Sequence, residues 1–184
     1  MKKLNIPFYA QREIVEESEK NGACGVVCVK MILDFIHDTT HDVDNLIKET
    51  YIVGGKEPAG WNHEALVRVL RNHGVSSYKQ EFISHTVSDL SLTAGVLNSE
   101  QTEKFSELGI QKIKKSIDAG YPVMVSVKAG FGANESSHII LIIGYDEENF
   151  YINDSQRPSS EEHPLVCSIE QFKTFWKNPV IFLE

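Results

Sequence analysis

The chain is organised around one run, Asn21-Gly22-Ala23-Cys24-Gly25-Val26-Val27-Cys28-Val29-Lys30-Met31-Ile32-Leu33-Asp34-Phe35. A polar, glycine-containing turn leads into apolar residues at helical spacing, so the run predicts a buried helix. Cys24 then lies in or just before its first turn, where unpaired backbone N–H groups and the helix dipole favour an anion. A thiol in that position forms the nucleophilic thiolate at lower pH than a free cysteine does. The run therefore indicates Cys24 as a candidate nucleophile, against the alternative that it only fills space in a core.

Composition narrows the class of protein. The 184 residues are 41% hydrophobic and 24% charged, which is typical of one soluble globular domain over residues 1–184. A formal net charge of −8 and the lack of a basic patch argue against a nucleic-acid partner. Three cysteines are too few for a disulfide framework. The longest apolar run, 139–143, is too short to span a membrane. Without a visible signal peptide, we expect a cytoplasmic protein.

The pattern along the chain predicts an α+β fold. Residues from about 12 to 119 form a predominantly helical part, and residues from about 120 to 184 form an antiparallel β part. Between them, residues 84–107 show little periodicity and are interpreted as an insertion or flap over the helical part, with a short helix from Ser99 on as an open alternative. The expected helices cover 24–36, 42–51, 61–72, 109–119 and 169–176, and the expected strands cover 75–83, 121–127, 137–145, 150–154 and 180–183.

Two patterns raise the question of a metal site, and neither leads us to expect one. His37 and His41 have the spacing of a helical metal pair, but the intervening Asp-Thr-Thr favours a solvated turn. A zinc site built from Cys24, Cys28 and a histidine is a remote alternative, because Cys28 is best explained as core. We therefore predict no metal and no cofactor.

The β part supplies two partners for a cysteine nucleophile. His138 stands at the head of the most apolar strand, and Asp154 ends the return strand of the same predicted hairpin. A histidine base and a carboxylate that orients it are the groups that a thiol nucleophile needs. A simple ladder leaves the two residues about four positions, roughly 13 Å, apart along the strand. A bulge, strong twist or shifted register has to close that gap.

Several short segments occur in an order that matches a known family. They are Ile6-Pro7-Phe8-Tyr9-Ala10-Gln11, Asn21-Gly22-Ala23-Cys24-Gly25, Met31-Ile32-Leu33, Gly120-Tyr121-Pro122-Val123, Ser137-His138, Gly144-Tyr145-Asp146 and Ile152-Asn153-Asp154. In these segments and in their order along the chain, this sequence resembles the papain-like cysteine peptidases. It is most similar to the branch that contains the bacteriocin-processing peptidase domains of peptide-exporting ABC transporters and their stand-alone relatives. The resemblance implies a papain-like fold with the nucleophile helix packed on the antiparallel sheet.

The resemblance also implies a role for each matched residue. Cys24 is expected to be the nucleophile, His138 the base and then the acid, and Asp154 the residue that holds the imidazole tautomer. Gln11 matches the family glutamine whose amide donates to the oxyanion. The relatives usually carry proline where this chain has Val26 and Ser155.

We therefore expect a thiol peptidase or amidase acting on a peptide or protein substrate. Two alternatives remain open: a catalytically silent peptide-binding module of the same fold, and a thiol acyltransferase that uses the same acyl-enzyme. The double-glycine specificity of transporter-linked relatives is not carried over, and the sequence predicts no oligomeric state.

Overall fold

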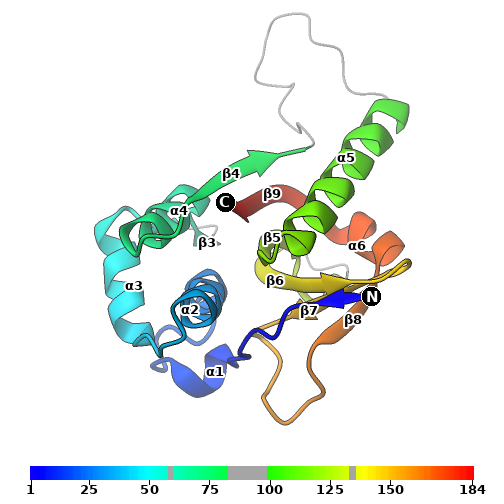
Figure 1. The fold of residues 1–184 in the computed structure, drawn as a ribbon. Helices are drawn as coiled ribbons and strands as arrows, with labels where there is room; N and C mark the ends of the chain where they lie inside the picture. Colours follow the sequence, from blue (N-terminus) through cyan, green and yellow to red (C-terminus); the bar gives the residue numbers. More distant parts are fainter. Residues whose placement is uncertain (58–59, 83–98, 133–135) are drawn as a thin grey trace, which may run out of the picture.

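The computed structural model describes residues 1–57, 60–82, 99–132 and 136–184 (Figure 1). Its centre is a seven-stranded antiparallel sheet in the order β4-β9-β5-β6-β7-β8, with β1 paired to β6. The strands are β1 (Lys2–Lys3), β4 (Ser77–Glu81), β5 (Val123–Lys128), β6 (Ser137–Tyr145), β7 (Asn149–Asn153), β8 (Leu165–Ser168) and β9 (Trp176–Leu183). A separate two-stranded sheet pairs β2 (Lys56–Glu57) with β3 (Gly60–Trp61).

Helices cover both faces of the large sheet. They are α1 (Gln11–Ile14), α2 (Cys24–His37), α3 (Val43–Ile52), α4 (His63–Asn72), α5 (Ser99–Asp118) and α6 (Ile169–Phe175). One hydrophobic core lies between the sheet and α2, α3 and α4, and a second lies between the opposite face and α5 and α6. The predicted α+β class, with the nucleophile helix on an antiparallel sheet, is confirmed. Two strands of this sheet, β1 and β4, come from the first 119 residues, so the sheet is not built from the C-terminal part of the sequence alone.

The helix α2 lies between the sheet and two other helices, so it is buried on nearly all sides. Every residue from Gly25 to Asp34 is buried, which explains why its apolar run is not confined to one stripe. Gly25 allows the close approach: a Cβ there would lie 2.8 Å from Leu66 Cδ1 and 3.1 Å from Ile139 Cδ1. One turn later, the Cys28 thiol donates to the Ile139 carbonyl over 3.7 Å. The start of α2 is thereby fixed against α4 and β6.

The hairpin formed by β6 and β7 has a bulge that affects the site. Tyr145 pairs with Phe150, but the register shifts between Ile142 and Gly144, and Asn153 then lies opposite Leu141. The carbonyl of the bulged Ile143 accepts the N–H of Leu4 over 2.8 Å, so the N-terminal segment satisfies it. Asp154, one residue beyond Asn153, is therefore about two positions, roughly 7 Å, from the level of His138. A simple ladder would leave four positions, so the bulge closes part of this gap, in line with the expectation from the sequence.

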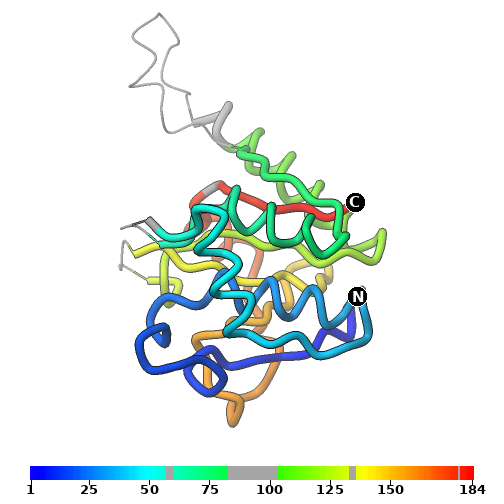
Figure 2. Tube along the Cα trace, turned by 90° about the vertical axis from the view of Figure 1, so that its left-hand side faces the viewer, coloured from blue at the N-terminus to red at the C-terminus, as the bar shows by residue number. Residues whose placement is uncertain are grey.

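The N-terminal segment runs beside the loop that follows β7, as the blue and orange traces in Figure 2 show. The Gln11 N–H donates to the Ser155 carbonyl over 2.7 Å, and the Ser159 N–H donates to Glu13 Oε1 over 2.9 Å. These bonds connect the N-terminal segment to the loop after β7, close to Asp154. In the described parts of the chain, we find no helix with the length and apolar character needed to cross a bilayer.

The helix α5 starts at Ser99, ten residues before the helix expected from periodicity. Residues 99–107, interpreted from sequence as part of an insertion or flap, belong to this helix, and residues 84–98 lie outside the described residues. Gly109 is buried where α5 approaches Trp176: a Cβ there would lie 2.3 Å from Cη2 of the indole and 3.0 Å from Cγ of Phe82. Glycine at this position therefore serves packing against the second core.

Gly109→Ala is expected to destabilise the protein despite the better helix propensity of alanine. Overpacking costs about 1–3 kcal/mol, while the gain in propensity is about 1 kcal/mol. We expect a net loss of up to about 2 kcal/mol in the free energy of unfolding, measured by urea titration. Lys115→Ala, on the same helix, should stay near wild type. A Gly109→Ala protein more stable than wild type would contradict the packing of α5 described here.

Candidate active site

Cys24 is the first residue of α2, and its side chain is half-buried. The preceding N-cap residue is Ala23, which makes no side-chain capping bond. Backbone N–H groups of the first turn are therefore not taken up by a capping oxygen, and they remain available to an anion. The helix dipole acts in the same direction. The sequence prediction that Cys24 lies at the first turn is confirmed.

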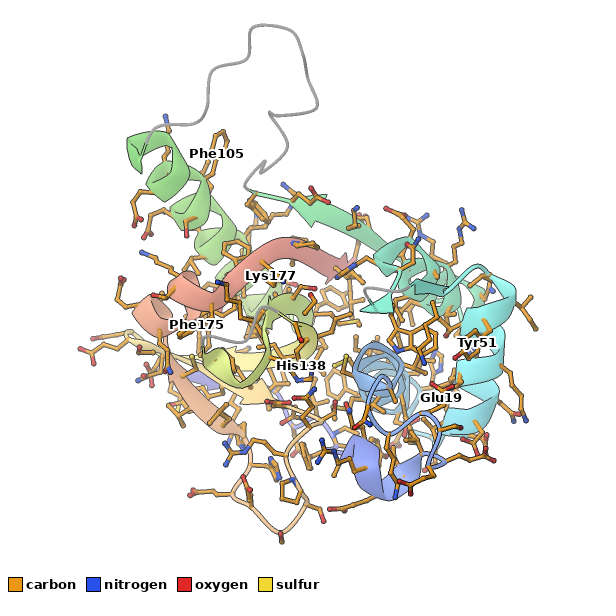
Figure 3. The ribbon with its side chains drawn as sticks, turned by 180° about the vertical axis from the view of Figure 1, so that it is seen from behind. Glu19, Tyr51, Phe105, His138, Phe175 and Lys177 are labelled. Atoms are coloured by element: carbon orange, nitrogen blue, oxygen red, sulfur yellow. The ribbon has the colours of Figure 1, made fainter. Side chains whose placement is uncertain are left out.

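His138 and Asp154 form a buried hydrogen-bonded pair. The ring atom Nε2 of His138 lies 2.6 Å from Asp154 Oδ1, and His138 is only 1% exposed. The same carboxylate oxygen accepts the N–H of Gln156 over 3.0 Å, which fixes its position. Because Nε2 is bonded to Asp154, Nδ1 is the ring nitrogen available to Cys24. This atom is buried and lies outside strict hydrogen-bond geometry with any described residue. Figure 3 shows His138 in the middle of the molecule, between the sheet and α2.

The surroundings shift the pKa of Cys24 downwards. Burial by itself raises the pKa of this thiol, but the neighbouring His138 lowers it through hydrogen bonding and charge. The backbone N–H groups of Ile139 and Gly25 lower it further. The net result is a pKa below the ordinary value for cysteine. Backbone donors to the Cys24 sulfur therefore come both from β6, at Ile139, and from α2, at Gly25.

The pKa of His138 moves in the opposite direction. Burial lowers it, but hydrogen bonds to Asp154 and Cys24, and their charges, raise the pKa to about 9. For Asp154, burial raises the pKa, and the interaction with His138 outweighs it, so the net pKa is below the ordinary value. These shifts favour an ionised carboxylate, an imidazolium and a thiolate as neighbours.

The other two cysteines have a different character. Burial, with the charges of Cys24 and Asp154, raises the pKa of Cys28 well above its ordinary value. Burial raises the pKa of Cys167 to about 11. Both thiols are buried, and all three cysteines are free. Cys24 is therefore the cysteine that the fold makes most acidic.

Gln11 is buried beside the loop that follows Asp154. Its side-chain amide donates to the Lys20 carbonyl over 2.8 Å, and its Oε1 accepts the hydroxyl of Ser155 over 2.9 Å. The amide nitrogen carries two protons, and Lys20 takes one of them. The bond from Ser155 thus helps to fix the orientation of the Gln11 amide. The expected oxyanion role of Gln11 stays a prediction, because its side chain does not line the cleft described next.

Cys24 opens onto a cleft of about 710 Å³ between the two halves of the molecule. Trp61 and His63 contribute to one wall, and Glu81, Ile139 and Gln156 contribute to the other. His63 reaches across to the sheet, where its Nε2 lies 2.7 Å from Ser126 Oγ. A cleft of this size accommodates a few residues of an extended peptide.

Side chains far apart in sequence hold the loop that precedes Cys24. The indole N–H of Trp61 donates to the Gly22 carbonyl. Glu19, in the same loop, accepts from Tyr51 over 2.8 Å and from Lys56 over 2.9 Å (Figure 3). Sequence reasoning missed the site roles of Trp61, Lys56 and His63. In the sequence, the one signal for such a role was Trp61, an aromatic residue directly after the glycine-rich segment 54–60.

Comparisons with known proteins identify the family and the fold of this chain. A family model described as the Peptidase_C39 like family matches residues 3–179. No curated protein gives a significant match.

Solved structures are similar over nearly the whole chain. One, described as a C39-like peptidase from Bacillus anthracis, has a TM-score of 0.66 at 17% identity and covers 100% of this chain and 98% of its own. A double glycine motif protease from an AMS/PCAT transporter, in complex with the leader peptide, has a TM-score of 0.58 at 13% identity, covering 99% and 93%. The peptidase domain of Streptococcus ComA, a bifunctional ABC transporter, has a TM-score of 0.58 at 16% identity, covering 89% and 91%. At these identities the likeness concerns the fold.

The alkylation rate of Cys24 against pH is expected to rise with a midpoint below about 8.5, the value of a free thiol. His138→Ala should move this midpoint above that value, because burial then acts on the thiol without the imidazole. Iodoacetamide labelling resolved by mass spectrometry measures both, and Cys28 and Cys167 serve as slow internal controls. A midpoint that His138→Ala leaves unchanged would contradict the coupling.

Proposed function

We propose that this chain, which belongs to the Peptidase_C39 like family, is a cysteine peptidase that hydrolyses a peptide or amide bond through an acyl-enzyme on Cys24. One observation carries the proposal: the thiol at the start of α2 is next to a buried histidine whose far nitrogen is held by a carboxylate. The three groups have the relation of nucleophile, base and orienting residue that acyl transfer to a thiol requires.

In the first half-reaction, the Cys24 sulfur attacks the substrate carbonyl carbon while His138 Nδ1 holds the proton that came from the thiol. The carbonyl oxygen becomes an oxyanion. His138 then gives its proton to the departing amine nitrogen, the C–N bond breaks, and a thioester remains on Cys24. Asp154 stabilises the imidazolium throughout, because its carboxylate stays bonded to Nε2.

In the second half-reaction, His138 Nδ1 takes a proton from a water molecule, whose oxygen attacks the thioester carbon. The C–S bond then breaks, the carboxylic acid product departs, and Cys24 returns to the thiolate beside the imidazolium that holds the proton from water. The backbone N–H of Cys24, at the start of α2, is the proposed first donor to the oxyanion. The proposed second donor is the Gln11 amide proton that Lys20 does not take.

Cys24→Ala is expected to abolish hydrolysis, because no other group supplies the nucleophile. Cys28→Ala should keep most of the activity, because that thiol contacts only the Ile139 carbonyl and core side chains. The measurement is the release of new peptide N-termini from a diverse peptide library, detected by mass spectrometry. Full activity in Cys24→Ala would overturn the mechanism. A wild-type protein that cleaves no library member and has an unreactive Cys24 would favour a peptide-binding module.

Asp154→Asn is expected to reduce turnover less than His138→Ala does. The asparagine oxygen still accepts from Nε2 and from Gln156, but it no longer carries the charge that raises the pKa of His138 to about 9. Removing a general base costs about 10²–10⁴-fold, so the loss in Asp154→Asn should lie below that in His138→Ala. NMR titration of the imidazole should show a pKa below that of wild type. An unchanged imidazole pKa would argue against the electrostatic role of Asp154.

A further inference from the structure

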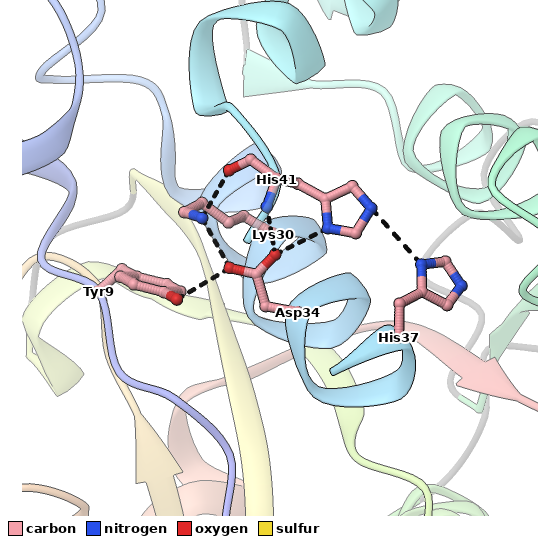
Figure 4. Close-up of polar contacts among 5 residues, drawn as sticks. All are labelled: Tyr9, Lys30, Asp34, His37 and His41. Carbon is pink, nitrogen blue, oxygen red and sulfur yellow. Dashed lines mark hydrogen bonds and ion pairs between the residues drawn. The ribbon is translucent and has the colours of Figure 1, made fainter. Parts of the chain in front are cut away.

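The far end of α2 brings two histidine rings together, with their centroids 5.3 Å apart and their planes tilted by 46°. The helix ends at His37, and Asp38 adopts the left-handed conformation with φ 51°, which turns the chain back on itself. His41 then returns to the helix end, and its Nε2 lies 3.5 Å from Nδ1 of His37 (Figure 4). The sequence predicted a turn between these residues, and a turn is present. The rings nevertheless meet as a helical pair would.

This separation matches the geometry of a chelated metal ion. Two imidazole nitrogens bound to Zn²⁺ at about 2.0–2.1 Å in tetrahedral geometry lie roughly 3.3–3.4 Å apart. The two ring atoms are the ones that face each other, so a small rotation of the exposed His37 is sufficient to admit the ion. The negative end of the α2 dipole lies at His37, and it favours a cation there.

A carboxylate orients His41 for this role. Asp34 Oδ1 lies 2.8 Å from His41 Nδ1 and also accepts the backbone N–H of His41 over 2.8 Å. With the Nδ1 proton directed to the carboxylate, Nε2 presents its lone pair to His37. Histidines that bind metals usually donate their other N–H to a carboxylate in this way.

Asp34 is itself held in place. Its Oδ2 accepts from Lys30 over 2.6 Å and from Tyr9 over 2.8 Å (Figure 4), and its side chain is 3% exposed. The Lys30 ammonium also donates to the His41 carbonyl over 2.6 Å. The backbone and ring of His41 are therefore fixed before any ion binds, which reduces the entropic cost of binding.

We propose that His37 and His41 form a two-histidine site for a divalent transition-metal ion of the imidazole-preferring class, with Zn²⁺ as the reference ion. Across the described residues, no three His, Cys, Asp or Glu side chains are grouped to hold a metal, so water completes the coordination. His73 packs edge-on against His41 with ring centroids 5.4 Å apart and points its Nε2 to Glu49, so it serves as a neighbour and not as a ligand.

The site is independent of the proposed peptidase mechanism. Cys24 is the first residue of the 14-residue helix α2, and the histidine pair lies at the other end of that helix. A bound ion cross-links the end of α2 to the residue just before the Asp42 cap of α3. It therefore stabilises the folded state by mass action without touching Cys24.

Zinc titration of the full chain by calorimetry tests the proposal, in a Cys24→Ala background that removes the competing thiolate. We expect one ion per chain, at least a tenfold loss of affinity in His37→Gln and in His41→Gln, and no change in His73→Gln. Mg²⁺, which prefers oxygen ligands, should not bind there. Zinc should also raise the midpoint of thermal unfolding, and His37→Gln should abolish that rise.

His37→Gln changes an exposed side chain, so it remains informative if His41→Gln fails to fold. Saturable binding that survives His37→Gln would overturn the assignment, and so would the absence of binding at millimolar zinc. An equal loss in His73→Gln would overturn the two-ligand geometry. All readouts are made without the nucleophile, so failure of the peptidase proposal leaves this test unaffected.

Discussion

The candidate site depends on how closely the start of α2 approaches β6. Gly25 makes this possible, because any side chain there would meet Leu66 and Ile139. The contact is reinforced one turn later, where the Cys28 thiol donates to the carbonyl of Ile139. Since Ile139 directly follows His138 in β6, the same contact sets the distance between the Cys24 thiol and the imidazole. Packing in the core therefore determines the geometry of the chemistry at its edge.

Burial and charge oppose each other at the thiol–imidazole pair. Burial raises the pKa of Cys24 and lowers that of His138, so a dry site alone would keep both groups neutral. Asp154 reverses the outcome by bonding to the far side of the ring, and Cys24 and His138 then stabilise each other's charge. Gln156 holds the carboxylate, and Ser155 holds the Gln11 amide nearby. The two residues after Asp154 thus fix both the Asp154 carboxylate and the Gln11 amide.

Local pattern was sufficient for the helix at Cys24 and for the strands that carry His138 and Asp154, because periodicity reports which faces are buried. It was insufficient to predict the register in which β6 and β7 pair. The bulge at Ile143 depends on a hydrogen bond from Leu4, which no local rule contains. Trp61 and His63 look like ordinary core and capping residues in the sequence, and only tertiary packing brings them to the cleft. The sequence left open a short helix from Ser99 on, but it did not predict that this helix is continuous with the one expected over 109–119, because its first residues are polar and lack an apolar stripe.

The bonds that connect the site span most of the chain. Gln11 and Ser155 are 144 residues apart, and the contact between Cys28 and Ile139 spans 111 residues. Contacts of such separation form late, because closing long loops costs entropy before any contact compensates for it. During synthesis, Cys24 emerges more than a hundred residues before His138, its neighbour in the folded protein. Until β6 packs against α2, Cys24 lacks the neighbouring groups that lower its pKa in the folded protein.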